Sequence, residues 1–384
     1  FFPNRRHAVL AAHKKFLFAR TAEALLIAGS VLLYLEYGTW DLNALLGAIR
    51  EQDPQLRSQI AALFFALAAL IKCAQFPAHG WLIQVVEAPT PVSALLHAGV
   101  INLGGILLLL FAPLLAKVPA AQWLILIVAG VTTAVAALVM TVEVSVKARL
   151  AWSTSAQMGL MLVECALGLY QLALLHLVAH SCYKAYVFLS AGSTVHRAAL
   201  SNPADGQPAG LKTWAASGFT AAIITLVAAW TFSESGAISP WIILGSLLTL
   251  LLVETHVRGD SRNAAVAGGA AVLLVIAFAV QKLLAANVMA PSEDAALPLA
   301  DFWISSLIIL LLIVNALIRE LPTHKTIHQL KTYLYAGFYV DEIVTRITLR
   351  LWPVPFPRHL DFDGADQHKW DAQNTRSIPL QESL

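Results

Sequence analysis

The sequence repeats one pattern about ten times: a run of roughly 20 mostly apolar residues, which is long enough to cross a bilayer as a helix. The apolar residues come in continuous runs, not in the one-sided stripes of soluble helices. Apolar residues make up 58% of the chain and charged residues 12%, and the mean hydropathy is +0.69. We therefore expect an all-α polytopic membrane protein, with spans near residues 16–37, 59–77, 91–115, 122–144, 150–170, 171–194, 211–232, 240–256, 264–285 and 302–318.

The positions of lysine and arginine predict how these spans are oriented. If the amino terminus lies in the cytoplasm, that side collects most of the basic residues, and the opposite side holds only Arg50, Arg57 and Lys117. Both ends are then cytoplasmic. The net charge of +2 gives no reason to expect a nucleic-acid partner.

The chain divides into a membrane domain over residues 1–319 and a cytoplasmic, amphipathic and polar tail over residues 320–384. Residues 328–352 mix apolar and charged side chains at partly helical spacing, so they are expected on the membrane surface or on a partner. The start lacks an initiator methionine, and we expect this chain to be the later part of a longer protein.

Lys72 places an ammonium group inside the apolar run of residues 61–73. A charge at bilayer depth costs at least about 2.5 kcal/mol, so such a residue is a functional candidate. Pro77, Pro89 and Pro91 follow closely and disfavour regular helix, which predicts a broken or re-entrant connection. Loose backbone at this depth needs protein or water partners, so we expect an aqueous pocket near Lys72. The alternative is a lysine that snorkels to the interface.

A second group of ionisable side chains lies in the run of residues 171–194. His176, His180 and Lys184 are spaced i, i+4, i+8 and so share one helix face. Histidine titrates near neutrality, so this stripe is suited to passing protons through intervening water. The alternative is hydrogen bonding that only holds helices together. No metal site or cofactor is expected, because neither histidine has a thiol or carboxylate ligand nearby in sequence.

Three further charged residues, Glu143, Lys147 and Arg149, lie where one span turns into the next. They are either the cytoplasmic mouth of an ion path or ordinary positive-inside anchors. Glu164 lies in the middle of a span, and both a relay role and a packing hydrogen bond are open for it. No His-Glu-x-x-His or nucleophile-elbow pattern is present, so a membrane-embedded hydrolase is not expected.

Residues 69–105 contain Phe-Pro-Ala-His-Gly-Trp and Glu-Ala-Pro-Thr-Pro-Val-Ser-Ala-Leu-Leu-His-Ala-Gly. This stretch resembles the core signature of the antiporter-like membrane subunits, which occur in respiratory complex I, in Mrp-type cation/proton antiporters and in DabB-type subunits of bacterial inorganic-carbon pumps. Residues 146–159 and 175–193 also resemble segments of this family. The resemblance covers about residues 14–258 in order.

The resemblance implies roles for single residues and a fold. Lys72 falls on the central proton-relay lysine of the family, and His97 falls on the histidine of the following broken region. The later proton-relay residues of the family fall on Lys147, His176, His180 and Lys184. The implied fold has two inverted bundles with broken helices near the midplane of the membrane.

Two features depart from the family pattern. The family pairs its central lysine with a glutamate on an earlier helix, and we expect this carboxylate to be missing because the chain begins after that helix. In respiratory relatives Lys-Asp-Glu follows Phe-Phe-Ser, whereas here Phe232-Ser233 leads to Glu234-Ser235. This segment therefore differs from the outer half of a complex I-like route.

Among the subfamilies, the DabB type is the most similar. The similarity rests on the basic amino-terminal segment, the motif Val-Glu-Ala-Pro-Thr-Pro and the late segment Tyr-Ala-Gly-Phe-Tyr-Val-Asp-Glu. This implies a subunit of the bacterial inner membrane that conducts H⁺ or Na⁺ and drives an inorganic-carbon (CO₂/bicarbonate) pump. The implied partner is a DabA-type zinc-binding protein resembling β-carbonic anhydrase, and the carbon chemistry would belong to it. One alternative is a proton-translocating subunit of a complex I-like or Mrp-type complex. Another is a non-conducting anchor that recruits an enzyme through its tail.

Overall fold

The computed structural model describes residues 6–200, 209–232, 237–258 and 298–353, together with a few isolated positions between residues 269 and 280. Within these residues the secondary structure is helical throughout. The first part of the bundle comprises α1 (Arg6–Tyr37), α2 (Leu42–Glu51), α3 (Leu56–Lys72), α4 (Gly80–Gln84), η1 (Val85–Glu87), α5 (Thr90–Ala98), η2 (Val100–Asn102), α6 (Leu103–Leu110), α7 (Ala112–Ala116), α8 (Pro119–Val142), α9 (Val146–Ala166) and α10 (Tyr170–Leu200). The second part comprises α11 (Leu211–Phe232), α12 (Ser239–Arg258), α14 (Pro298–Glu320), α15 (Lys325–Tyr335), η3 (Gly337–Tyr339) and α16 (Val340–Leu351).

The described helices confirm an all-α polytopic membrane protein. Six of them are long and apolar enough to span a bilayer, or up to seven if the bent pair α2 and α3 counts as one span. About ten were expected. Helix α9 forms where a span was predicted but is less apolar, α12 contains only a short apolar helix, and the span predicted at 264–285 lies largely outside the described residues.

The predicted break after Lys72 is confirmed. Helix α3 ends at Lys72, and Ala74 adopts a positive φ of 51° before the short helix α4 begins at Gly80. Pro89 then precedes α5, and Gly99 with η2 separates α5 from α6. The chain therefore crosses this region in short helical pieces, as its prolines predict.

Close helix packing fixes these pieces in place. Helix α3 packs against α1, α6 and α8, and α9 packs against α8 and α10. At Gly104 a Cβ would collide with the backbone of Ala69 on α3, and at Gly159 it would collide with side chains and backbone of neighbouring elements. Small residues at such contacts let helices approach closely, which is how membrane helices associate.

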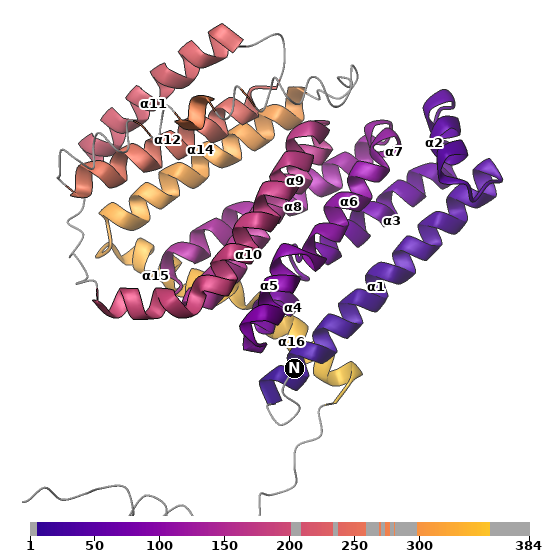
Figure 1. The fold of residues 1–384 in the computed structure, drawn as a ribbon, viewed down its shortest axis with the longest axis horizontal. Coiled ribbons are helices and arrows are strands. Elements are labelled where there is room, and N and C mark those ends of the chain that lie inside the picture. The colour runs from indigo at the N-terminus through magenta and orange to yellow at the C-terminus, as the bar shows by residue number, and fades with distance from the viewer. Residues whose placement is uncertain are drawn as a thin grey trace, which may run out of the picture.

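Figure 1 shows α11, α12 and α14 grouped beside the bundle of α1–α10, while α15 and α16 run across the ends of the helices. These are the ends at which α1 begins and at which α8 and α14 finish, and we call them the tail-side ends. Leu334 of α15 is fully buried there in a cluster with Trp152 and Ile318. The tail helices thus pack on the chain's own membrane helices, whereas the sequence suggested the membrane surface or a partner.

One ion pair fastens α16 to the bundle. The Nζ atom of Lys14, a fully buried residue of α1, lies 2.7 Å from Asp341 Oδ1. Gln84 Nε2 donates to Asp341 Oδ2 at 2.8 Å. The carboxylate lies directly over Gly80, where a Cβ would overlap it. We call these four residues the Asp341 clasp.

Candidate functional site

Lys72 is paired with a carboxylate. Its Nζ lies 3.4 Å from Glu23 Oε1 on α1, and the other Glu23 oxygen lies 2.7 Å from Arg20 Nη2. This carboxylate comes from the first helix of the chain, and we did not expect it from the sequence, where only the family's glutamate on an earlier helix was considered. The signal in the sequence was an acidic residue within the first apolar run, which is itself unusual.

Gln75 connects the broken segment after Lys72 to α9. It is fully buried, and its Nε2 donates to Cys73 O at 2.6 Å and to Ser155 O at 3.2 Å. Its Oε1 lies against Gly159 and has no hydrogen-bond partner among the described residues. Sequence reasoning missed Gln75, because an uncharged amide beside a lysine gives no distinctive pattern.

His97 lies on the other side of α9, at the end of α5. It is fully buried, stacks on Phe188 with ring centroids 4.3 Å apart, and has Nδ1 3.1 Å from Thr154 Oγ1. The Thr154 hydroxyl donates its own proton to Leu150 O at 3.0 Å. It must therefore accept from His97 Nδ1, which leaves Nε2 of the neutral ring as the free acceptor of a proton.

The predicted stripe on α10 forms and faces α9. His176 Nδ1 lies 3.0 Å from Glu164, and its Nε2 lies 2.9 Å from Gln157 Oε1. Lys184 is fully buried and donates to Leu150 O at 3.1 Å. Glu164 thus belongs to the stripe through an ion pair with His176 when that ring is protonated.

His180 lies between these two residues on α10, one turn from each. It is buried, and neither of its ring nitrogens has a hydrogen-bond partner among the described residues. Helix α5, which carries His97, packs against α10, so both helices bring ionisable residues to one interface.

Several buried polar atoms along this route have no hydrogen-bond partner within the described part of the chain. They are Gln75 Oε1, Ser155 Oγ, Asn102 Oδ1, His97 Nε2 and both ring nitrogens of His180. Buried polar groups in native proteins almost always pair with protein or with ordered water. These atoms belong to residues of the Lys72 break, α5, η2, α9 and α10, and we call this set of residues, together with Lys72 and Lys184, the polar seam.

The third predicted group lies apart from the stripe. Glu143 Oε1 accepts from Ser145 N at 2.9 Å, so its carboxylate caps the turn between α8 and α9. Lys147 is half-buried, and no hydrogen bond or ion pair joins it to another described residue. Arg149 is exposed and borders a cleft between α8 and α14.

These features define a polytopic α-helical membrane protein with ionisable side chains held between its helices. Residues 1–205 match the family described as "NADH:quinone oxidoreductase/Mrp antiporter, TM". The chain is 48% identical over 93% of its length to a protein of Hydrogenovibrio crunogenus named "Probable inorganic carbon transporter subunit DabB", and it spans 69% of that protein. It is also 34% identical, over 51% of its length, to NADH-ubiquinone oxidoreductase chain 5 of Metridium senile, of which it covers 33%.

Among solved structures, the Mrp complex from Dietzia sp. contains a chain that matches this one with a TM-score of 0.55 at 20% identity. The match covers 100% of this chain and 48% of that one, and it shows a shared fold. The protein belongs to the antiporter-like membrane subunit family, and within it to the DabB-type inorganic-carbon transporter subunits.

Proposed function

We propose that this chain is the cation-conducting membrane subunit of an energy-coupled inorganic-carbon pump, and that the polar seam is its proton route. The observation that carries this proposal is the line of buried, unpaired polar atoms between two buried or half-buried lysines. Nothing in helix packing requires such a line, and each of its members is costly in a bilayer. The similarity to a DabB-named transporter subunit supports the carbon-uptake assignment.

In this proposal protons move by short steps. Lys72 holds a charge that Glu23 stabilises, and a proton released there reaches Ser155 through water near Gln75. His97 Nε2 and a ring nitrogen of His180 accept it, because an imidazole nitrogen without a hydrogen-bond partner can bind a proton. Lys184 is the last buried base on this face of α10.

The side chains of the seam favour protons over Na⁺. Na⁺ is held by clusters of oxygen ligands, as other hard cations are. The seam offers imidazole and amine nitrogens, which bind protons, and its amide and hydroxyl oxygens are spread along it. Replacing a proton gradient by a Na⁺ gradient should therefore not drive the flux.

The partner and location follow from the same proposal. The carbon chemistry belongs to a DabA-type zinc-binding subunit resembling β-carbonic anhydrase, and this chain is a transporter subunit without catalysis of its own. The distribution of lysine and arginine supports a cytoplasmic carboxy terminus in the inner membrane of a bacterium.

The direct test is carbon-dependent growth of cells that carry the full-length subunit with Lys72→Met. We expect growth at ambient CO₂ to be lost while the two subunits still co-purify. The matched control is Lys325→Met on α15, an exposed lysine away from the seam, which should grow normally. Normal growth of the Lys72→Met strain would remove Lys72 from the mechanism.

A second candidate function is a proton-translocating subunit of a complex I-like or Mrp-type complex. The identity to chain 5 and the fold shared with an Mrp chain favour it. Affinity purification of the tagged subunit separates the two. A zinc-bearing soluble partner supports the carbon pump, whereas quinone-enzyme or small antiporter subunits support the alternative.

A further inference from the structure

A cleft of about 1230 Å³ opens between α8–α9 and α12–α14, and α15 lines it at the tail-side end. It is larger than the roughly 300–1,000 Å³ of typical small-molecule pockets. None of the polar-seam residues lines it, although Gln157, which contacts His176, does. None of the roles discussed so far accounts for it.

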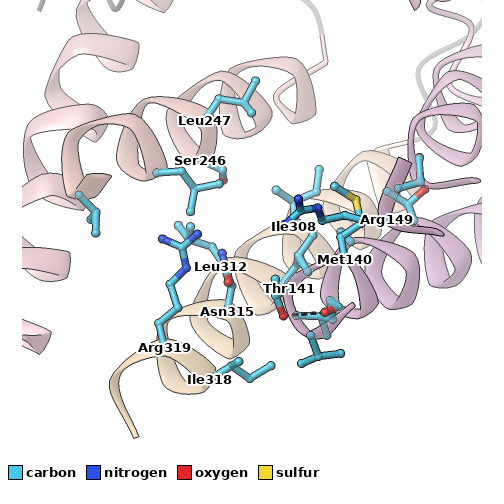
Figure 2. A pocket seen from close by; sticks show the side chains of 18 of the residues that line it. Met140, Thr141, Arg149, Ser246, Leu247, Ile308, Leu312, Asn315, Ile318 and Arg319 are labelled. Atoms are coloured by element: carbon cyan, nitrogen blue, oxygen red, sulfur yellow. Dashed lines mark hydrogen bonds between the residues drawn. The ribbon is translucent and has the colours of Figure 1, made fainter. Parts of the chain in front are cut away.

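The chemistry of the cleft changes along its length. Its walls are apolar, with Leu247 from α12 and Ile308 and Leu312 from α14, as Figure 2 shows. Its tail-side end is lined by the basic side chains Arg149, Arg319, His328 and Lys331. In Figure 2, Arg319 points from α14 toward α12, and Arg149 extends toward Ile308.

Two acidic side chains also line this end, and Glu254 offsets the charge of Arg319. Glu320 accepts hydrogen bonds from Ala209 N, Gly210 N and Trp214 Nε1 at 2.7–3.1 Å. Glu254 lies 3.7 Å from Arg319. Within the described residues no ion pair joins Arg149 or Lys331 to an acidic group, so this end of the cleft is cationic.

A further polar group lies one helical turn from Arg319. Asn315 lines the cleft from the same face of α14, and its Oδ1 is buried without a hydrogen-bond partner among the described residues. A buried amide oxygen needs a donor. A hydroxyl group on a molecule bound in the cleft would supply one beside the basic side chains.

We propose that this cleft binds an anionic phospholipid with a hydroxyl-bearing headgroup, such as phosphatidylglycerol. The acyl chains lie along the apolar walls, the phosphate meets Arg149 and Lys331, and a headgroup hydroxyl donates to Asn315. A lipid is favoured over a soluble anion because the walls are apolar and their helices lie in the hydrocarbon region. Basic pockets between membrane helices on the cytoplasmic side bind anionic headgroups in this way.

The test is lipid binding to the purified full-length protein, measured by native mass spectrometry with phosphatidylglycerol and phosphatidylcholine of equal chain length. We expect a preference for phosphatidylglycerol that falls about fivefold in Arg149→Gln and again in Lys331→Gln, because each basic group near a membrane surface contributes about 1 kcal/mol. The control Lys325→Gln removes a charge from α15 outside the cleft and should bind as the unmodified protein does. Equal binding of both lipids, or unchanged binding in both cleft variants, would overturn the proposal.

A second variant fills the cleft and leaves its charges unchanged. Leu312→Trp should abolish the preference for phosphatidylglycerol, and glycerol phosphate without acyl chains should not compete for the site. Competition by glycerol phosphate would assign the site to a soluble anion. Crosslinking of a Ser246→Cys variant to another protein chain would assign the cleft to a partner helix. Competition by glycerol phosphate and crosslinking to a partner would each overturn the proposal.

Discussion

Glu23 on α1 gives Lys72 a negatively charged neighbour within the helix bundle. A carboxylate beside a lysine between helices offsets the lysine's charge and lowers the cost of holding that charge in the bundle. The 3.4 Å separation and the competing 2.7 Å contact of Glu23 with Arg20 describe a pair that is held weakly. Such a pair suits a switch better than a permanent structural bridge.

The first prediction concerns this pair. Glu23→Gln keeps the size of the side chain and removes its charge, so Lys72 loses its charged partner on α1. We expect proton flux to fall but not to vanish, whereas Lys72→Met should abolish it. Stopped-flow measurement of internal pH in proteoliposomes checks both, and equal flux in Glu23→Gln and the unmodified protein would show that the pair plays no part.

The second prediction concerns Glu164 and His176, which share two contacts of 3.0 Å. A double-mutant cycle with Glu164→Gln and His176→Asn should give a coupling of about 1 kcal/mol in thermal unfolding, the usual size for polar pairs between membrane helices. Gln157→Ala serves as a comparison, since it removes only the contact to the other ring nitrogen. Additive effects of the two substitutions would mean that the ion pair does not form.

The sequence predicted the α10 stripe because helical spacing alone places its three residues on one face. It did not predict that Glu23 lies beside Lys72 or that Gln75 contacts Ser155. Those contacts depend on the rotation and register of one helix against another, and periodicity within a single helix carries no information about either.

Broken helices could likewise be predicted from sequence, because Pro77, Pro89 and Pro91 act locally on the backbone. The position of the tail could not. The spacing of residues 328–352 is amphipathic and is consistent with a lipid surface, a partner or the chain's own helices. In the structure Asp341 contacts Lys14, from which it is separated by 327 positions in sequence, and no local pattern predicts such a contact.

The third prediction concerns the Asp341 clasp. Asp341→Asn leaves the buried ammonium of Lys14 without its charge partner, which costs about 2 kcal/mol, the usual size for a hydrogen bond between charged groups. We expect a lower unfolding temperature in detergent and faster proteolysis of the tail. Glu342→Gln, the exposed neighbour on α16, is the matched control and should change neither.

Gly80→Ala tests the same clasp from the other side. A Cβ at this position overlaps the Asp341 carboxylate, so α16 must move away. Combined with Asp341→Asn, the substitution should add little, because the clasp is already weakened. Full additivity would show that Gly80 acts through the backbone of α4 and not through Asp341.

Considered as a whole, the molecule has two helix groups with different contents. The bundle of α1–α10 holds the polar seam, and α11, α12 and α14 lie beside it (Figure 1). The cleft is lined by α8, α9, α12, α14 and α15. The runs of apolar residues predicted a polytopic protein, but they gave about ten spans where the described residues contain six or seven. Helix α9 is one cause of the difference. A span was predicted there, but α9 is less apolar than the helices that are long and apolar enough to cross a bilayer.

Proton conduction through the polar seam is the central claim. Proton flux through the full-length subunit with its partner in liposomes tests this claim most directly. The unmodified complex should acidify the lumen under an imposed proton gradient, and Lys184→Met should reduce that rate at least tenfold without disturbing assembly. The exposed Lys325→Met control should conduct normally. Unchanged flux in the Lys184→Met complex would contradict a route through α10.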